Sequence, residues 1–458
     1  GKNICFIAGG IGVTVFLWYG FQRMKIAIIG FAREGRAIYK YLRNRSSLDS
    51  TQDKPGYKKV EWWVLDRDDN LKVPKGVRAV LGEKYLDDLE KYDLVYRSPG
   101  VPLHLLKKAK KISSLTKLFF EEYKGKIIGV TGTKGKGTTS TLLYKILKAN
   151  EALRLRSGQP RKEVFLAGNI GVPALEVLDT HSTSSGQENS LVVLELSSFQ
   201  LHDLTQSPEV AVVLGIFPDH QDAHKNLKEY YEAKASIAKF QKKSDVVFYV
   251  KNNPVAKKIA EMSTGRKIPV DLKNFDLFKN TEMGMAGVHN YLNAVMAASV
   301  AKYLGVKDGV IKKEVLKFKG NEHRMQLVKE IDEVRFYNDS ASTNPKSTSA
   351  AVASFKEDLV LIAGGLGKGL DYSEWQKTLD KPNLKKVVLI GENKKDLLEV
   401  LRNLRNKIVL VESLKEAVDL AKEEAGHGSV VLFSPGAASF DMFLSYADRG
   451  QKFVSLLE

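Results

Sequence analysis

Short apolar runs alternate with glycine turns and helical stretches along most of the chain. The first runs lie at residues 25–30, 60–66 and 92–97, and a helical stretch follows the first of them to residue 42. Apolar runs bounded by turn residues are typical of strands. Their alternation with helices is typical of a parallel sheet covered by those helices. We therefore predict a small parallel α/β unit at the start of the chain.

Two further groups of apolar runs follow. Runs at 126–132, 190–199 and 208–217 are continuously apolar, as expected for strands buried on both faces of a parallel sheet. A strong helical pattern covers residues 290–305, whose alanines indicate close packing. From near Asn321 the sequence predicts five more strands, alternating with helical stretches, at 334–340, 358–365, 385–392, 407–413 and 428–436.

The three groups predict an α/β chain of three domains, with no internal repeat. The expected order is a Rossmann-like N-terminal domain, a central P-loop-type ATPase domain and a C-terminal Rossmann-like domain. The boundaries that we predict are 24–117, 118–320 and 321–458. A chain of 458 residues is long enough for several cores of ordinary size.

Residues 1–23 differ from the rest because residues 3–21 are apolar and uncharged. About 20 such residues would span a bilayer, and Arg23 and Lys25 would then hold the main body on the cytoplasmic side. The alternative is that Met24 is the true start, since the strand pattern begins there. The segment is thus either a membrane anchor or a spurious extension.

Composition and charge reduce the number of possible function classes but do not select one. The chain is 43% hydrophobic and 27% charged, with a formal charge of +17 and a pI near 9.4. A basic chain favours anionic partners, but no aromatic-basic RNA motif, zinc spacing or basic helix indicates a nucleic-acid module. The single cysteine, Cys5, excludes an internal disulfide framework and fits a reducing compartment. We expect a cytoplasmic monomer that binds no nucleic acid.

The stretch GVTGTKGKGTTS, residues 129–140, is nearly a phosphate-binding loop. A strict P-loop has a glycine where Val130 stands and a hydroxyl where Gly137 stands; here the first hydroxyl comes at Thr138. Backbone amides of a glycine-rich turn at a helix start cradle anions, and Lys136 would reach the β- and γ-phosphates of ATP. Thr138 would offer its hydroxyl to Mg²⁺.

The earlier glycine turn, Gly30 to Gly35, departs from the dinucleotide pattern because Ala32 replaces the middle glycine. Asp66, at the end of the next strand, stands where an acid would hold a ribose. A dinucleotide dehydrogenase, a mononucleotide site and a purely structural turn all remain open from these residues alone.

Acidic and imidazole side chains follow two central strands. Glu195 lies near the end of a buried strand, where a carboxylate is costly unless it is paired or bound to metal. Because parallel sheets present that edge to ligands, we interpret Glu195 as a Mg²⁺ ligand. The next strand end offers Asp219, His220, Asp222 and His224. Lys234 has the pattern of a solvated helix lysine, and the residues alone give it no role.

The third domain has polar loops at its predicted strand ends. Arg324 is a candidate phosphate clamp, and Asp339 with several hydroxyls ends the first strand. Loops rich in glycine or hydroxyls end two other strands and carry Lys368, Ser434 and Ser439. Together these loops predict an anion pocket.

In their order and spacing, the segments GNIGVPAL, ELSSFQL, HNYLNA, NDSASTN and SPGAASFD resemble the Mur ligases from about Met24 to the C-terminus. The branch that they resemble most joins D-glutamate to UDP-N-acetylmuramoyl-L-alanine in peptidoglycan synthesis. The resemblance implies an amide ligase that uses ATP and Mg²⁺ at two sites. ATP phosphorylates the substrate carboxylate, and the incoming amine then attacks the acyl phosphate.

The resemblance also implies residue roles. Lys136, His220 and Lys234 would be catalytic, and Lys234 would be carbamylated, which turns its ammonium into a metal-bridging carboxylate. Metal ligands would be Thr138, Glu195, His220 and Lys234. ATP would contact Gly132, Thr133, Lys134, Gly135, Lys136, Gly137, Thr138, Thr139, Asn290, Asn293, Arg324 and Asp339. The uridine substrate would contact Asp66, Arg67, Ser98, Gly100, Asn169 and Ser197. The amino acid would contact Thr343, Lys368, Ser439 and Tyr446.

Two positions depart from the branch's pattern. Gly137 replaces its usual hydroxyl, which makes the loop resemble that of folylpolyglutamate synthases. Ala341 replaces a lysine in its Asp-Ser-Lys motif, so that either Lys346 or Lys368 compensates or the acceptor differs. The alternatives are therefore a ligase with another acceptor amino acid, a folylpolyglutamate-synthase-like ligase and a non-catalytic relative.

Overall fold

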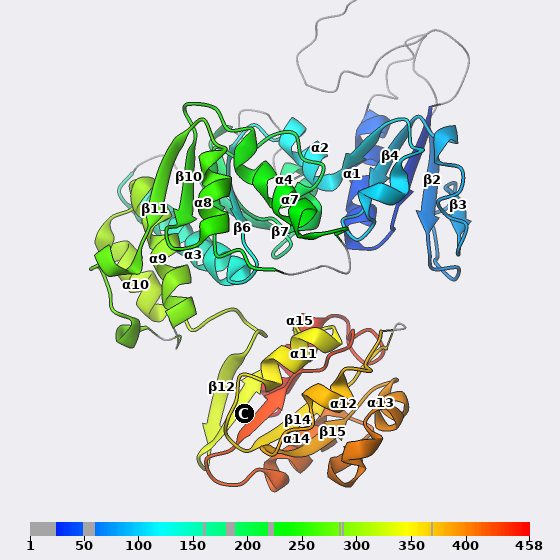
Figure 1. The fold of residues 1–458 in the computed structure, drawn as a ribbon, viewed down its shortest axis with the longest axis vertical. Coiled ribbons are helices and arrows are strands. Elements are labelled where there is room, and N and C mark those ends of the chain that lie inside the picture. The colour runs from blue at the N-terminus through cyan, green and yellow to red at the C-terminus, as the bar shows by residue number, and fades with distance from the viewer. Residues whose placement is uncertain are drawn as a thin grey trace, which may run out of the picture. The chain divides into compact units, whose positions relative to one another are not determined.

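The computed structural model describes residues 24–48, 60–158, 162–179, 188–218, 224–283, 285, 288–367 and 370–458. The chain forms two compact units, one ending at Phe318 and the other beginning at Lys319 (Figure 1). The apolar leader, residues 1–23, lies outside the described residues. Within the described ranges, no helix combines the length and the apolar character needed to cross a membrane.

The first sheet is parallel throughout, in the order β3-β2-β1-β4-β5. Strand order reverses between β1 and β4, and ligands of open α/β sheets bind at such a point, beyond the strands' carboxyl ends. The strands are β1 (Lys25–Ile29), β2 (Glu61–Asp66), β3 (Arg78–Leu81), β4 (Leu94–Arg97) and β5 (Ile112–Ser114). The helices are α1 (Arg33–Leu48), the 3₁₀ turns η2 (Leu89–Lys91) and η3 (Leu103–Leu106), and α2 (Leu115–Glu122).

The second sheet is also parallel, in the order β11-β10-β9-β6-β8-β7. Its strands are β6 (Lys126–Thr131), β7 (Glu163–Gly168), β8 (Ser190–Glu195), β9 (Val210–Val213), β10 (Val246–Val250) and β11 (Arg266–Val270). Its helices are α3 (Lys136–Arg156), α4 (Ala174–Asp179), α6 (Ser198–Leu201), α7 (Leu227–Lys239), α8 (Pro254–Glu261), α9 (Val288–Tyr303) and α10 (Asp308–Lys317), with the 3₁₀ turns η4 (Leu272–Asn274) and η5 (Asn280–Glu282).

Both faces of this sheet are buried, because successive side chains of a strand point to opposite faces. Ile128 of β6 belongs to the core beneath α3, α9 and α10, whereas its neighbour Ile127 belongs to the core on the other face. This two-sided burial explains why the strands are continuously apolar in sequence.

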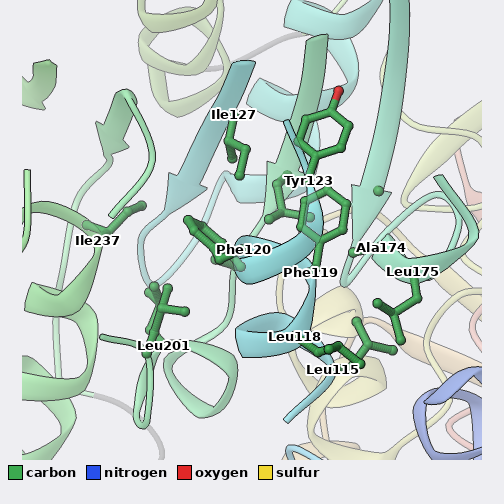
Figure 2. Close-up of a cluster of buried hydrophobic side chains, with 14 of the residues drawn as sticks. Leu115, Leu118, Phe119, Phe120, Tyr123, Ile127, Ala174, Leu175, Leu201 and Ile237 are labelled. Carbon is green, nitrogen blue, oxygen red and sulfur yellow. The ribbon is translucent and has the colours of Figure 1, made fainter. Parts of the chain in front are cut away.

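The core on the Ile127 side continues into the first sheet. One buried cluster joins β1 residues such as Ile28 to residues of α2, α4 and α7. Figure 2 shows α2 in this cluster, with Phe119 and Tyr123 on the side of the α4 residues Ala174 and Leu175, and Phe120 on the side of Leu201 of α6. The rings of Phe119 and Tyr123 stack with centroids 4.9 Å apart. The first two sheets therefore share one hydrophobic core.

The second unit holds the third sheet, in the order β12-β13-β17-β14-β15-β16. Only the β12–β13 pair is antiparallel. The strands are β12 (Gln326–Ile331), β13 (Val334–Asn338), β14 (Leu359–Ala363), β15 (Leu384–Leu389), β16 (Ile408–Leu410) and β17 (Val430–Phe433). The helices are α11 (Pro345–Val352), α12 (Trp375–Thr378), α13 (Lys394–Val400), α14 (Leu414–Glu424) and α15 (Tyr446–Ser455), with the 3₁₀ turn η6 (Arg402–Lys407).

The predicted fold class is confirmed: the chain is α/β and is built on three mainly parallel sheets. All five strands predicted after Asn321 are present, and β12 is a sixth strand that the apolar pattern did not reveal.

Candidate active site

The glycine loop lies between β6 and α3, at the point where the order of the second sheet reverses. Gly135 caps α3 with φ of +84°, a left-handed conformation that favours glycine. A Cβ on Gly135 would lie 2.2 Å from Oδ1 of Asn293, a buried residue of α9. Gly135 and Asn293, both predicted ATP contacts, therefore lie side by side. The loop approaches α9 so closely that only glycine fits.

We expect Gly135→Ala to weaken ATP binding by at least about tenfold, or about 1.4 kcal/mol. The added methyl must displace the Asn293 amide and also strains the backbone. Gly158→Ala at the other end of α3 is a matched control, because Gly158 has φ of +74° and nothing within 4 Å of its added Cβ. Calorimetric titration of ATP into each variant checks the prediction. Equal affinities of the two variants would contradict it.

Lys136, the first residue of α3, folds back over this loop. Its Nζ donates to the carbonyl oxygens of Gly132 at 3.0 Å and Thr133 at 2.9 Å. Thr138 is partly buried in the first turn of α3. The next two hydroxyls, Oγ1 of Thr139 and Oγ of Ser140, are buried without a hydrogen-bond partner among the described residues. Buried hydroxyls normally have a hydrogen-bond partner, so two hydroxyls at the start of α3 remain available for further hydrogen bonds.

Glu195 ends β8 and is 3% exposed. Its Oε1 accepts a hydrogen bond of 3.0 Å from Nδ2 of Asn169, at the end of the neighbouring strand β7. Its Oε2 is buried and has no hydrogen-bond partner among the described residues. A buried carboxylate oxygen without a partner is costly, and Mg²⁺ prefers oxygen ligands of this kind. The residues present therefore fit a divalent cation at Glu195.

Lys234 of α7 is buried, with 2% of its surface exposed. Its Nζ donates to the Gly132 carbonyl oxygen at 2.9 Å and lies 4.9 Å from the ring centroid of Tyr230. Lys136 and Lys234 therefore bond to the same carbonyl oxygen. The sequence pattern of Lys234 predicts a solvated helix lysine, and that expectation is wrong, because α7 turns this side chain inward onto the glycine loop.

His220 lies outside the described residues, as do Asp219 and Asp222. His224 is described and buried, with its ring stacked on Phe199 and its Nε2 3.0 Å from Oγ of Ser198. The candidate donor atoms of His202, His224 and Glu229 lie within 4.8 Å of one another. His202 Nε2 is 3.5 Å from Glu229 Oε1, and burial lowers the pKa of His202. This cluster packs α6 against α7.

At the first sheet, polar groups gather where β1, β2 and β4 end. Oδ2 of Asp66 accepts a 2.6 Å hydrogen bond from the amide of Phe31, and Oγ of Ser98 donates to the Gly30 carbonyl. Asp66 thus stabilises the Gly30 turn. Arg67 and Gly100 are exposed at the same edge, where strand order reverses. The predicted uridine contacts of the first domain therefore lie at one edge of its sheet.

In the second unit, Asp339 follows β13 and is buried. Its Oδ2 accepts hydrogen bonds from Ser342 Oγ at 2.6 Å and Ser434 Oγ at 2.8 Å. Burial raises the pKa of Asp339, although these hydrogen bonds oppose the shift. Arg324 is exposed near this carboxylate, and its charge also opposes the shift.

The predicted amino-acid contacts lie in the loops around Asp339, apart from Lys368, which lies outside the described residues. Ser439 is buried after β17, Tyr446 begins α15 with 45% of its surface exposed, and Thr343 precedes α11. A residue that sequence reasoning missed is Arg449, which is fully buried and donates to Oγ and the carbonyl of Ser340 and to the carbonyls of Ala437 and Ala438. No local pattern marks an arginine as buried.

Two family models match the chain. One is described as the Mur ligase middle domain and matches residues 130–276. The other is described as the Mur ligase, glutamate ligase domain and matches residues 323–436.

Curated relatives match over nearly the whole chain. The UDP-N-acetylmuramoylalanine–D-glutamate ligase of Clostridium tetani is 34% identical and covers 94% of this chain and 96% of its own. The enzyme of the same name from Acetivibrio thermocellus is 33% identical and covers 95% of this chain and 96% of its own.

Among solved structures, UDP-N-acetylmuramate-alanine ligase from Thermotoga maritima aligns with a TM-score of 0.50 at 17% identity. It covers 94% of this chain and 99% of that chain. Folylpolyglutamate synthase from Mycobacterium tuberculosis aligns with a TM-score of 0.51 at 14% identity, covering 75% of this chain and 94% of that chain. At these identities the structures show a shared fold.

Proposed function

Because the chain belongs to the Mur ligase family, we propose that it is the ATP-dependent ligase that joins D-glutamate to UDP-N-acetylmuramoyl-L-alanine in peptidoglycan synthesis. The relatives at 33–34% identity carry the name of that enzyme. The observation that carries the proposal is the arrangement around the glycine loop. Lys136 and Lys234 share the Gly132 carbonyl, and Glu195 ends the neighbouring strand β8 with a buried oxygen that is not hydrogen-bonded in the described structure.

The reaction divides into two steps. The carboxylate of the alanyl substrate attacks the γ-phosphorus of ATP, which forms an acyl phosphate and releases ADP. The amine of D-glutamate then attacks the acyl carbon, and the tetrahedral intermediate expels phosphate as the amide forms. Phosphoryl transfer needs alignment and charge neutralisation more than covalent work by the protein, and this site supplies lysines and a metal carboxylate.

We assign the residues accordingly. The loop amides and Lys136 hold the ATP phosphates, while Asn293 supports the loop at Gly135. Glu195, with Thr138 and His220, holds Mg²⁺, which would supply Lewis-acid charge neutralisation at the phosphates. Lys234 joins the metal site as a carbamate. Asn169 orients Glu195 through its 3.0 Å hydrogen bond and borders the muramoyl group.

The same proposal divides the work among three domains. Residues 24–117 hold the uridine nucleotide at the edge formed by Asp66, Ser98 and their neighbours. Residues 118–320 bind ATP. Residues 321–458 bind the acceptor amino acid, where Asp339 and the buried Arg449 order the loops that carry Thr343, Ser439 and Tyr446.

The acceptor is tested by phosphate release from ATP with UDP-N-acetylmuramoyl-L-alanine, Mg²⁺ and a panel of D- and L-amino acids. We expect release with D-glutamate alone, which would mean that Lys346 or Lys368 compensates for the lysine that Ala341 replaces. Omission of the uridine substrate is the control and should abolish release. Release with a different amino acid would make Ala341 a change of specificity. No release with any amino acid would contradict the proposed ligase.

A further inference from the structure

We propose that Arg97 and Gln200 are positioning residues. They fix the edge of the first sheet that is proposed to hold the uridine nucleotide to the turn that follows Glu195, the proposed Mg²⁺ ligand. The inference rests on the proposed function, because that function places two parts of one substrate, its uridine nucleotide and its reacting carboxylate, on opposite sides of this link. The turn comprises α6 and the residue that caps it, Ser197.

Arg97 is the last residue of β4 and directly precedes Ser98, a predicted uridine contact. It is 1% exposed, and its Nη2 donates to Asp203 Oδ1 at 2.9 Å and to the Phe199 carbonyl at 2.6 Å. Its Nη1 donates to the Val101 carbonyl at 3.2 Å, within its own loop. A planar guanidinium can satisfy several acceptors at fixed angles. Arg97 thus clamps its own loop and the end of α6 with one rigid group.

Gln200 makes the second link. Its Oε1 accepts from the amide of Ser197 at 3.0 Å, and its Nε2 donates at 2.8 Å to Oε1 of Glu34, in the first turn of α1 directly after the Gly30 turn. The two partners fix the orientation of the amide, because a backbone N–H needs an acceptor and a carboxylate needs a donor. Gln200 is 3% exposed. One side chain therefore joins the first glycine turn to the cap of α6.

Both links end within a few residues of Glu195. Leu196, which follows Glu195, is tied to β6 by its amide, which donates to the Val130 carbonyl at 2.9 Å, and β6 leads directly into the glycine loop. The segment 195–203 thus touches the strand that carries the ATP loop at one end and the nucleotide edge of the first sheet at the other. A shift of about 1 Å at a reacting group can cost about 100-fold in rate. Arg97 and Gln200 prevent such a shift between the anchored nucleotide and the metal carboxylate.

The test compares Gln200→Ala with Gln241→Ala. Gln241 is about as buried as Gln200, and its amide also joins two separate segments, because its Nε2 donates to the carbonyls of Pro208 and Val246, away from this link. Arg97→Met is compared with Arg78→Met, which removes a guanidinium of the same sheet that, unlike that of Arg97, is exposed and bonds Glu61. For each variant we would measure Tm, kcat, KM for ATP, and the dissociation constant of UDP-N-acetylmuramoyl-L-alanine by titration.

For Gln200→Ala and Arg97→Met we expect kcat to fall by about 10-fold or more. Affinity for UDP-N-acetylmuramoyl-L-alanine should also fall, while KM for ATP stays within about twofold. A purely structural role would lower Tm without lowering kcat and uridine-substrate affinity selectively over KM for ATP, and this is the result that we expect for Gln241→Ala. Wild-type kcat and uridine-substrate affinity in both test variants would overturn the inference.

Hydrogen exchange separates this inference from the proposed function. In the wild-type protein, UDP-N-acetylmuramoyl-L-alanine alone should slow amide exchange at residues 196–201, and in Gln200→Ala it should not. Binding without that protection in the wild type would overturn the positioning role even if the ligase is active. Protection without phosphate release for any amino acid would retain the positioning role and contradict the ligase. Absence of binding would contradict both.

Discussion

Glu195→Gln is expected to lower kcat for phosphate release by about 10²–10³-fold while the protein remains folded. The substitution keeps the size of a side chain that is 3% exposed and can keep the hydrogen bond from Asn169. It removes the negative charge, however, and the neutral amide is a far weaker ligand for a divalent cation. The affinity of the site for Mg²⁺ should therefore fall together with kcat.

Thermal unfolding gives this prediction a second readout. Because a buried carboxylate oxygen without a partner is costly, Glu195→Gln should raise Tm in the absence of Mg²⁺ and abolish the rise in Tm that Mg²⁺ and ATP produce. Glu151→Gln is the matched control, since Glu151 is also buried but accepts hydrogen bonds from Lys162 and Arg154. That control should lose stability and keep its response to Mg²⁺. Activity above one tenth of wild type in Glu195→Gln would refute the assignment.

Lys234→Ala is expected to lose at least about 100-fold in kcat and to regain part of it with millimolar acetate or formate. In the proposed mechanism the amine of Lys234, which is buried beside the glycine loop, reacts with CO₂. That reaction forms a carbamate and releases a proton. The alanine variant leaves a space in which a small carboxylate can stand for the carbamate.

Two controls sharpen this test. Lys136→Ala should be inactive and should not respond to carboxylates, because its proposed role is to present a positive charge to phosphate. Lys239→Ala, in the last turn of the same helix α7, should retain activity. Full activity of Lys234→Ala without any added carboxylate would remove Lys234 from the mechanism. Loss without rescue by any small carboxylate would count against the carbamate and leave a cationic role.

The sequence predicts this fold well wherever an element is buried on both faces. The runs that became β6, β8 and β9 are continuously apolar, and their carboxyl ends place the glycine loop and Glu195 at one sheet edge. The apolar pattern does not predict strand β12, because β12 is a short edge strand. Its residues are only partly buried or exposed, and two of them, Lys329 and Glu330, are charged. Such strands form through pairing with a neighbour, in this case β13.

For the site, sequence position predicts which residues reach a sheet edge but not what they bond. Asp66 was expected at the end of a strand, and only the structure shows its carboxylate accepting from Phe31. The sequence pattern of Lys234 is that of a surface residue. Its burial depends on the packing of α7 against the glycine loop, which no local pattern shows. Arg97 and Arg449 carry no local signal, since the partners that draw them inward include Asp203, 106 residues from Arg97, and Ser340, 109 residues from Arg449.

The hydrophobic core shared by the first two sheets also constrains how the chain can fold during synthesis. Ile28 in β1 belongs to one buried cluster with residues of α4 such as Leu175, and α1 packs against both α2 and α4. The first sheet emerges from the ribosome before α4 exists, so part of the apolar surface of its helix α1 stays uncovered until about residue 179 has been made. We therefore expect residues 24–117 made alone to aggregate, and residues 24–318 to fold as one cooperative unit. Here the unit of function and the unit of folding differ.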